Sequence, residues 1–348
     1  MSIWLVDMKI ESEPKLDFNN VLIRPKRTIL TSRSQVDIER EFKFPHSTSI
    51  WKGVPVIAAN MDTIGTLEVY QVLSQHKIVT ALHKFYDLDD LKDKNLNEDY
   101  FMISTGISDT DYKRLKNILD NMKVKWVCID VANGYMQQLV DFCKRVRDDF
   151  PDKIIVAGNV VSREMTEELI INGKVDVVKV GIGPGSACVT RLKTGVGMPQ
   201  LSAVIESSDA AHGLNGYIIS DGGITCPGDM TKAFGGGADF VMIGGQFAGH
   251  DENPGEIIEE NKEKYKVFYG MSSEHAMKKH YGKMATYRSS EGRFIKLKYK
   301  GPLEDTVLDY LGGIRSCCTY INATSIKNMS KCTTFVMVSQ QVNNHFNN

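Results

Sequence analysis

The chain contains short apolar runs, rich in Val and Ile, that recur at fairly regular intervals and end in turn-forming residues. Runs that stay apolar at successive positions are typical of strands buried on both faces, as in a parallel sheet. Eight such runs predict eight strands, at Val54–Ala59, Lys77–Leu82, Phe101–Thr105, Lys125–Asp130, Lys153–Ala157, Val175–Gly181, Tyr217–Asp221 and Asp239–Gly244.

Segments with helical periodicity lie between these runs. Ser108 and Asp111 form a capping-box pattern, and the apolar positions that follow them recur every three or four residues. The segment Leu139–Phe150 repeats the same spacing. Eight strands that alternate with helices predict an α/β fold, a (β/α)8 TIM barrel rather than an open sheet.

Two connections of the predicted barrel are unusually long. The sixth and seventh strands start 42 residues apart, whereas most other steps are 22 to 28 residues. After the eighth strand, the chain runs from Gly245 to about Pro302 before a last helix, Leu303–Leu311. Barrel active sites are built from the loops at the carboxyl ends of the strands, so we expect ligands at these two loops. With residues 1–50 as an N-terminal extension and a polar tail after Arg315, residues 1–348 are predicted to form one domain.

Composition narrows the range of partners. The chain has 42 basic and 43 acidic residues, a net charge of −1, so we expect no attraction to nucleic acid or to an anionic membrane. No apolar stretch is long enough to span a bilayer, and the first residues do not resemble a signal peptide. The seven cysteines contain no CxxC pair, which indicates neither a zinc site nor a disulfide framework. We therefore expect a reduced, soluble, cytoplasmic protein.

The loop after the sixth strand, Gly181–Arg191, carries the strongest chemical signal. Its three alternating glycines let the backbone approach a ligand or an ion without a Cβ in the way. Cys188 follows in a predicted turn with Arg191 three residues on, an environment that favours a thiolate. The alternative is a small buried hydrophobe, which is the better interpretation of Cys143 on its apolar helical face. Because Cys188 stands at the active end of a barrel, we interpret it as a nucleophile.

Two glycine-rich turns follow the next two strands. They are Asp221–Gly223 and Gly244–Gly245, and barrels frequently bind phosphate between these loops. Asp221 suits hydrogen bonds from ribose hydroxyls. A single pair of glycines is often just a tight turn, but two pairs on adjacent strands favour a nucleotide. Neither a Rossmann fingerprint nor a Walker A motif is present, so a dinucleotide would have to lie across the barrel mouth.

Further polar residues stand where a ligand would lie. Asn60, Asp130 and Asn159 end the first, fourth and fifth strands, where they orient a ligand or cap the following helix. In the last insertion, Arg288 is a candidate for binding a phosphate or a base, and Glu291 is a candidate acid/base. The alternative for this pair is a solvated, charged loop.

A family resemblance is carried by four segments, namely Gly181–Arg191, Ser220–Gly223, Phe268–Ser272 and Tyr287–Gly292. Together they resemble the inosine-5′-monophosphate dehydrogenase and guanosine-5′-monophosphate reductase family, and the resemblance continues from Lys15 to Arg315. Two features favour the reductase branch. Only His83–Tyr86 joins the second strand to its helix, where dehydrogenases usually carry a regulatory insertion, and the last insertion lacks the Arg-Tyr pair that activates water in dehydrogenases.

The resemblance implies a reaction and three catalytic residues. Cys188 would attack C2 of the guanine base of GMP, and ammonia would leave with proton transfer assisted by Thr190 and Glu291. The covalent thioimidate would then be reduced by NADPH and released as IMP. Two alternatives stay open, namely the dehydrogenase direction with IMP and NAD, and a purine-nucleotide sensor without catalysis. Cys188, Thr190 and Glu291 together favour an enzyme, because binding alone requires none of them.

The resemblance also implies binding residues. Those for the nucleotide are Asp221, Gly222, Gly223, Gly244, Gly245, Gly270, Met271, Ser272, Arg288, Ser290 and Gly292. Those for NADPH are Ser32, Arg33, Lys84, Asp130, Val131, Ala132, Ile182, Gly183, Ser316 and Cys317. Ser32 and Arg33 would reach NADPH from a neighbouring subunit of a homotetramer, and a basic residue such as Arg33 or Lys84 would favour the 2′-phosphate. A monovalent cation, K⁺, would lie against backbone oxygens of Gly183, Gly185, Cys188 and Arg191.

Overall fold

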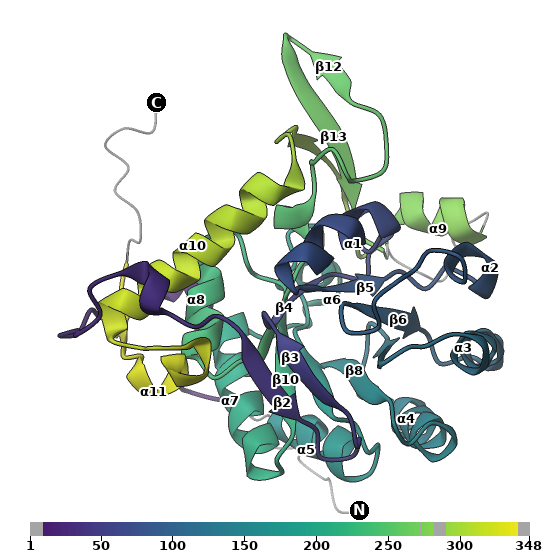
Figure 1. Cartoon of the computed structure of the whole chain (residues 1–348), viewed down its shortest axis with the longest axis horizontal. Helices are drawn as coiled ribbons and strands as arrows, with labels where there is room; N and C mark the ends of the chain where they lie inside the picture. Colours follow the sequence, from purple (N-terminus) through teal and green to yellow (C-terminus); the bar gives the residue numbers. More distant parts are fainter. Residues whose placement is uncertain (1–9, 272, 282–289, 340–348) are drawn as a thin grey trace, which may run out of the picture.

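Eight parallel strands close into a barrel surrounded by helices (Figure 1). This computed structural model describes residues 10–271, 273–281 and 290–339. Around the barrel the strand order is β10-β11-β4-β5-β6-β7-β8-β9, so successive strands are neighbours and the circle closes between β11 and β4. The predicted (β/α)8 barrel is confirmed. Its strands are β4 Val56–Ala58, β5 Val79–Leu82, β6 Phe101–Thr105, β7 Trp126–Asp130, β8 Ile154–Val160, β9 Val177–Val180, β10 Tyr217–Asp221 and β11 Phe240–Ile243.

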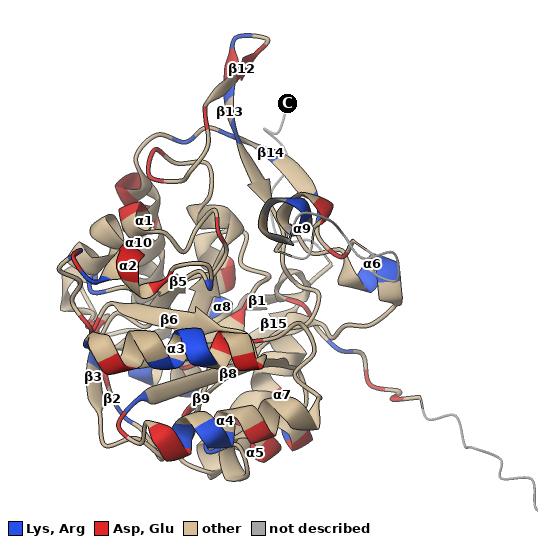
Figure 2. Ribbon diagram, turned by 90° about the vertical axis from the view of Figure 1, so that its right-hand side faces the viewer, with Lys and Arg blue, Asp and Glu red and all other residues tan. Residues whose placement is uncertain are grey.

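Helices cover the outside of the barrel, and the main core lies between them and the strands. The capping box predicted for Ser108 is present, because its hydroxyl accepts from the Asp111 N–H at 3.1 Å and the Asp111 carboxylate accepts from the Ser108 N–H at 3.1 Å. Charged residues lie on the outward faces of α3 and α4 (Figure 2). The covering helices are α1 Leu67–Leu73, α2 Leu88–Leu91, α3 Asp109–Asn121, α4 Gln137–Asp149, α5 Arg163–Ile171, α7 Gln200–Gly213, α8 Pro227–Gly235 and α10 Leu303–Ile321.

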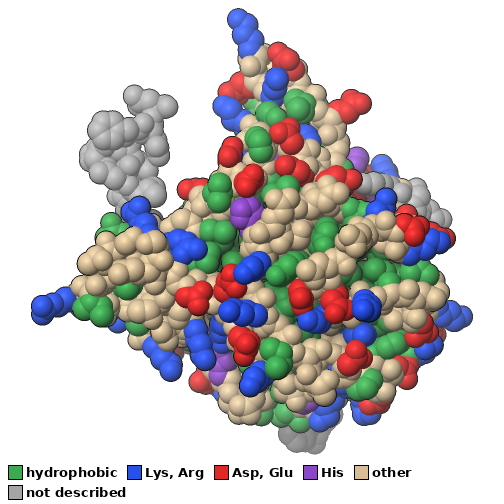
Figure 3. All heavy atoms as spheres, in the orientation of Figure 1, with side chains coloured by type: hydrophobic (Ala, Val, Ile, Leu, Met, Phe, Trp, Pro, Cys, Tyr) green, Lys and Arg blue, Asp and Glu red, His purple; other side chains and the backbone are tan. Residues whose placement is uncertain are grey.

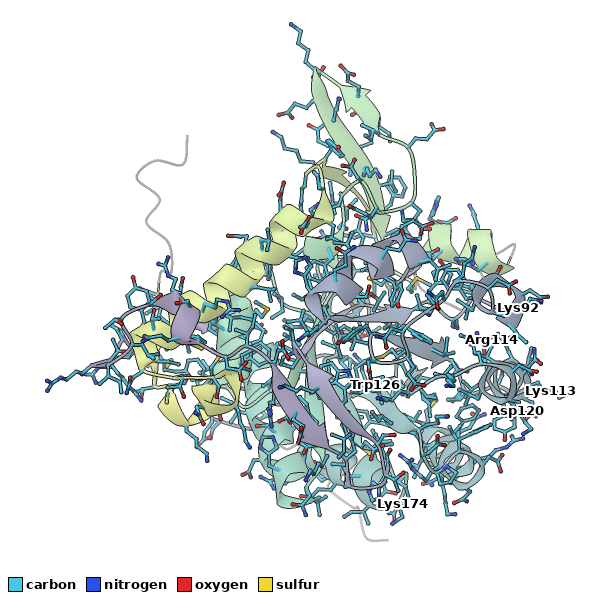
Figure 4. The ribbon with its side chains drawn as sticks, viewed as in Figure 1. Lys92, Lys113, Arg114, Asp120, Trp126 and Lys174 are labelled. Carbon is cyan, nitrogen blue, oxygen red and sulfur yellow. The ribbon has the colours of Figure 1, made fainter. Side chains whose placement is uncertain are left out.

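An N-terminal hairpin covers the end of the barrel formed by the amino ends of the strands. It consists of β2 Arg40–Lys43 and β3 Ile50–Gly53, which pair antiparallel. The ring of Phe42 stacks on Phe240 at 4.3 Å, and Trp51 meets Trp126 edge-on at 5.6 Å. Figure 4 shows Trp126 near the middle of the molecule, whereas Lys113 and Asp120 lie at its edge. Because this end is packed with aromatic rings, the open end is the one formed by the carboxyl ends of the strands.

The long connection after β11 forms a small domain-like projection (Figure 1). Its antiparallel sheet has the order β12-β13-β14. The buried Lys266 Nζ donates to the Asn253 carbonyl at 2.8 Å and so anchors the base of the sheet. The elements of this insertion are β12 Ile258–Glu260, β13 Glu263–Tyr269, α9 Glu274–Tyr281 and β14 Phe294–Lys298.

The prediction of a polar tail after Arg315 was wrong. Helix α10 continues to Ile321 because Ile314, Cys318 and Ile321 extend its apolar spacing and are fully buried. The chain then returns to its own N-terminal part, where β15 pairs antiparallel with β1. The remaining elements are η1 Phe18–Asn20, β1 Val21–Ile23, η2 Arg33–Gln35, η3 Ser74–His76, α6 Thr190–Thr194, η4 Gly245–Phe247, η5 Ile326–Asn328, α11 Met329–Cys332 and β15 Phe335–Met337.

The visible surface carries both signs of charge without a large patch of either. Lys and Arg side chains alternate with Asp and Glu side chains over the face shown in Figure 3. Within the described residues, no helix has the length and apolar character needed to cross a lipid bilayer.

Candidate active site

A pocket of about 280 Å³ opens at the carboxyl ends of the barrel strands. It is lined by strand ends, by the loop after β9 and by the insertion after β11. The pocket brings together most of the predicted site residues, namely Asp130, Val131, Ala132, Ile182, Gly183, Gly185, Cys188, Thr190, Asp221, Gly222, Gly223, Gly244, Gly245, Gly270, Met271, Glu291 and Gly292.

Three side chains in this pocket form a hydrogen-bonded chain. Cys188 Sγ lies 3.1 Å from Thr190 Oγ1, and the Thr190 hydroxyl donates to Glu291 Oε2 at 2.7 Å. Thr190 is the first residue of α6, so its hydroxyl is held at a helix start between the sulfur and the carboxylate. The arrangement suits a nucleophile whose proton transfers are relayed through a hydroxyl to a carboxylate.

The insertion after β11 positions this chain of groups. Cys188 and Gly292 form an antiparallel β-bridge, and the Val189 N–H donates to the Glu291 carbonyl at 2.8 Å. The Arg293 guanidinium donates twice to the Ser186 carbonyl, at 2.9 and 2.7 Å. A Cβ on Gly292 would lie 2.8 Å from the Ser273 nitrogen, so the close approach of these backbones requires glycine. Cys188 and Glu291 are therefore aligned by backbone pairing as well as by the side-chain hydrogen bonds.

Glycine is also required at the start of the cysteine loop. Gly181 has φ of +149°, and a Cβ there would lie 2.2 Å from the Asp221 carbonyl oxygen. The fully buried Gln200 supports the same loop, because its Nε2 donates to the Val180 carbonyl at 2.9 Å. Sequence reasoning did not select Gln200, since a glutamine at the start of a helix gives no signal of its own.

An ionic cluster forms the floor of the pocket. Lys179 Nζ lies 2.9 Å from Asp130 Oδ1 and 2.5 Å from Asp221 Oδ2. Asn60 Nδ2 donates to Asp130 at 3.0 Å, and Asn159 Nδ2 donates to Asp221 at 2.8 Å. These contacts bring together three strand-end residues that the sequence marked as ligand-orienting candidates. Lys179 was missed, and its local signal is a single lysine inside the apolar run of β9.

Burial and ion pairing shift the pKa values of Lys179 and Asp130 in opposite directions. Burial lowers the pKa of the Lys179 ammonium, but the Asp130 and Asp221 carboxylates outweigh it and the pKa lies above its ordinary value. Burial raises the pKa of the Asp130 carboxyl, but the Lys179 ammonium reverses that effect and the net pKa is lowered. Lys179 and Asp130 therefore remain charged at neutral pH.

Comparison with known proteins identifies the family. A profile of the IMP dehydrogenase / GMP reductase domain matches residues 15–345. The chain belongs to this family. Its relatives include proteins named GMP reductase from Shigella boydii serotype 18, Escherichia coli O139:H28 and Escherichia coli O157:H7. Each is 56% identical over 347 residues, which is 98% of this chain and 100% of the relative. The family resemblance found in four sequence segments is thus confirmed for nearly the whole chain.

Two residues expected from the IMP dehydrogenase / GMP reductase family pattern lie beside the pocket. The Ser290 hydroxyl accepts from the Glu274 N–H at 3.1 Å and donates to the Gly292 carbonyl at 3.0 Å, which ties α9 to the cysteine-pairing segment. The positive charge of Lys84 acts on Asp130 and contributes to lowering its carboxyl pKa. Ser272 and Arg288 lie outside the described residues.

Four predicted cofactor residues do not reach the pocket from this chain. Ser32 and Arg33 are exposed at η2, and Ser316 and Cys317 lie on α10, which packs against η2 (Figure 1). The chain therefore gathers the four residues at a second place, away from its own cysteine. The role predicted for Ser32 and Arg33 concerns a cofactor bound to a neighbouring subunit.

The predicted cation site of the family concerns main-chain oxygens of the cysteine loop. The Gly185 carbonyl accepts from the Cys188 N–H at 3.0 Å, which closes a tight turn before Cys188. The Arg191 guanidinium binds Asp17 at 3.1 Å and the Met198 carbonyl at 2.6 Å, so its charge is paired away from Cys188. Among the residues described here, no three His, Cys, Asp or Glu side chains cluster in a metal-binding arrangement.

Proposed function

We propose that this chain catalyses the reductive deamination of GMP to IMP and ammonia, with NADPH as reductant. The observation that carries the proposal is the hydrogen-bonded chain Cys188–Thr190–Glu291 inside the pocket. Relatives named GMP reductase that align over 98% of the chain support the same reaction.

The first half of the reaction needs a nucleophile and a route for protons. The Cys188 sulfur attacks C2 of the guanine base, and the bond from C2 to the amino group breaks. The departing amine needs a proton to leave as ammonia. The thiol proton passes through the Thr190 hydroxyl to Glu291, which delivers it to the amine. The thiol proton and the amino group together leave as ammonia, and the base stays bound to sulfur as a thioimidate. Splitting the displacement in this way replaces one difficult step with two easier ones.

The second half replaces the carbon–sulfur bond with a carbon–hydrogen bond. When bound, NADPH supplies the hydride, a two-electron reduction that matches the change from GMP to IMP. Cys188 then departs as a thiolate and regains its proton from solvent. The residues present fit a nicotinamide nucleotide, because the Asp130 carboxylate faces the pocket beside Val131 and Ala132 and can accept bonds from ribose hydroxyls.

Binding follows from the remaining groups. Asp221 accepts bonds from the ribose of GMP, and the backbone of the two glycine turns surrounds its phosphate. Ser32 and Arg33 reach NADPH bound to a neighbouring subunit, in a homotetramer, where Ser316 and Cys317 lie near the same cofactor. K⁺ is held by main-chain oxygens of the cysteine loop, and the protein works in the cytoplasm.

A spectrophotometric assay tests the proposal. With GMP and NADPH, absorbance at the reduced nicotinamide band is expected to fall while IMP and free ammonia appear in equal amounts. A rise with IMP and NAD, and no change with GMP and NADPH, would instead show the dehydrogenase reaction. Tight GMP binding without NADPH consumption would show a sensor.

A further inference from the structure

Lys179 is a buried lysine that has no part in the chemical steps above. It is the third residue of β9, and 3% of its surface is exposed. Its ammonium group contacts Asp130, at the end of β7, and Asp221, at the end of β10. In the barrel, β7 and β10 are separated by β8 and β9. One ammonium group therefore connects two parts of the pocket floor that backbone pairing does not join directly.

The charge balance of this cluster depends on Lys179. Two carboxylates and one ammonium leave a net charge of −1. Two neighbouring carboxylates without a cation between them disfavour each other's ionisation and tend to share a proton. Two further titratable groups act on the cluster, Cys128 from β7 and Lys84 from the segment after β5. Burial raises the pKa of the Cys128 thiol to about 12, so it stays neutral, and Lys84 acts on Asp130.

We propose that Lys179 is a positioning residue that couples the two ribose subsites. It holds Asp221 ready for GMP and Asp130 ready for NADPH through the same ammonium group. The inference rests on the proposed function, which assigns one ribose to each carboxylate. Within the described chain, Lys179 and Asn159 both bind Oδ2 of Asp221, which leaves Oδ1 to accept from a ribose hydroxyl.

Four single variants separate this role from a local one. Asp221→Asn is expected to weaken GMP binding, and Asp130→Asn to raise KM for NADPH, with a smaller effect of each on the other ligand. Lys179→Met is expected to weaken both ligands, each by about tenfold or more, since hydrogen bonds to charged groups are lost on both sides. Lys179→Arg keeps the cation and is expected to retain more of both affinities.

The pH dependence of GMP binding distinguishes a positioning role of Lys179 from a purely structural one, because a structural role would leave this dependence unchanged. The dissociation constant for GMP is measured by calorimetry, without NADPH, from pH 5.5 to 8.5. In Lys179→Met the two carboxylates share a proton at low pH, so GMP affinity is expected to fall as the pH falls. The double variant Asp130→Asn/Lys179→Met restores a net charge of −1, and its GMP affinity is expected to vary less with pH. This variant also provides the test if Lys179→Met does not fold.

Arg147→Met is the matched control. Arg147 forms a buried ion pair of 2.5 Å with Asp176, which immediately precedes the same strand β9 at the other end of the barrel. Its loss is expected to reduce stability but to leave both affinities and their pH dependence unchanged. The inference would be overturned if Lys179→Met had the affinities and the pH profile of the wild type. If only the double variant can be measured, a steep fall of its GMP affinity with falling pH would overturn the inference. Absence of NADPH-dependent GMP turnover in the wild type would instead overturn the proposed function.

Discussion

The Thr190 hydroxyl offers the sharpest test of the proposed chemistry. Replacing it by a methyl group in Thr190→Val keeps the shape of the side chain but removes the 3.1 Å contact to sulfur and the 2.7 Å bond to the carboxylate. General acid–base catalysis contributes about 10²- to 10⁴-fold. We therefore expect kcat for GMP to fall by about that factor, roughly 2.7–5.5 kcal/mol of barrier. GMP affinity should change little, because the ribose and phosphate contacts lie elsewhere in the pocket.

The two half-reactions can be measured separately. With IMP and NADP⁺ and no ammonia, the reverse of the second step forms the thioimidate and one equivalent of NADPH per site. This burst is expected to survive in Thr190→Val and in Glu291→Gln, whereas steady turnover with GMP is lost. Thr194→Val is the control, because Thr194 lies one turn later in α6 and is exposed, and this variant is expected to turn over normally. A burst reduced as much as turnover, or turnover within about threefold of wild type, would refute the assignment of Thr190 and Glu291 to ammonia release.

Three further predictions follow from single features. Cys188→Ser should abolish turnover while GMP affinity, measured by calorimetry, stays within a few-fold; full activity would exclude covalent catalysis. Gly181→Ala should lower the free energy of unfolding in urea by about 1–3 kcal/mol or more, because φ is +149° and the added Cβ meets the Asp221 carbonyl; an unchanged midpoint would contradict this. The hydrogen bond to Asp239 raises the pKa of His212 above 6.5, so its stabilisation is present at low pH and is lost as the pH rises through the raised value. The melting temperature of His212→Gln should accordingly fall further below wild type at pH 5.5 than at pH 8.5.

The barrel was predictable because its strands are buried on both faces. The run Phe101–Thr105 begins with three successive apolar residues, and the structure buries all five of its positions. The helix after it was predictable because Ser108 and Asp111 form a capping box and the apolar positions that follow recur every three or four residues. Helix α10 was underestimated, since Gly312 and Gly313 interrupt an apolar spacing that continues to Ile321.

The catalytic arrangement was only partly predictable. Cys188 and Glu291 were marked by their residue types and loops, but the bridge that aligns them joins segments about a hundred residues apart. No local pattern encodes such a pairing. Lys179 was missed for a different reason, because a lysine within an apolar run becomes meaningful only when the carboxylates of two other strands are placed around it.

The hairpin β2–β3 covers the end of the barrel at which the strands begin, so the barrel is open at one end only. Phe42 and Trp51 cover that end, and they belong to the same buried cluster as strand side chains such as Met102, so no passage crosses the barrel. Whatever is made at the sulfur must depart over the rim by which the reactants arrived. A dinucleotide bound across that rim would obstruct the release of ammonia. The order in which the cofactor binds and ammonia leaves therefore depends on this single opening.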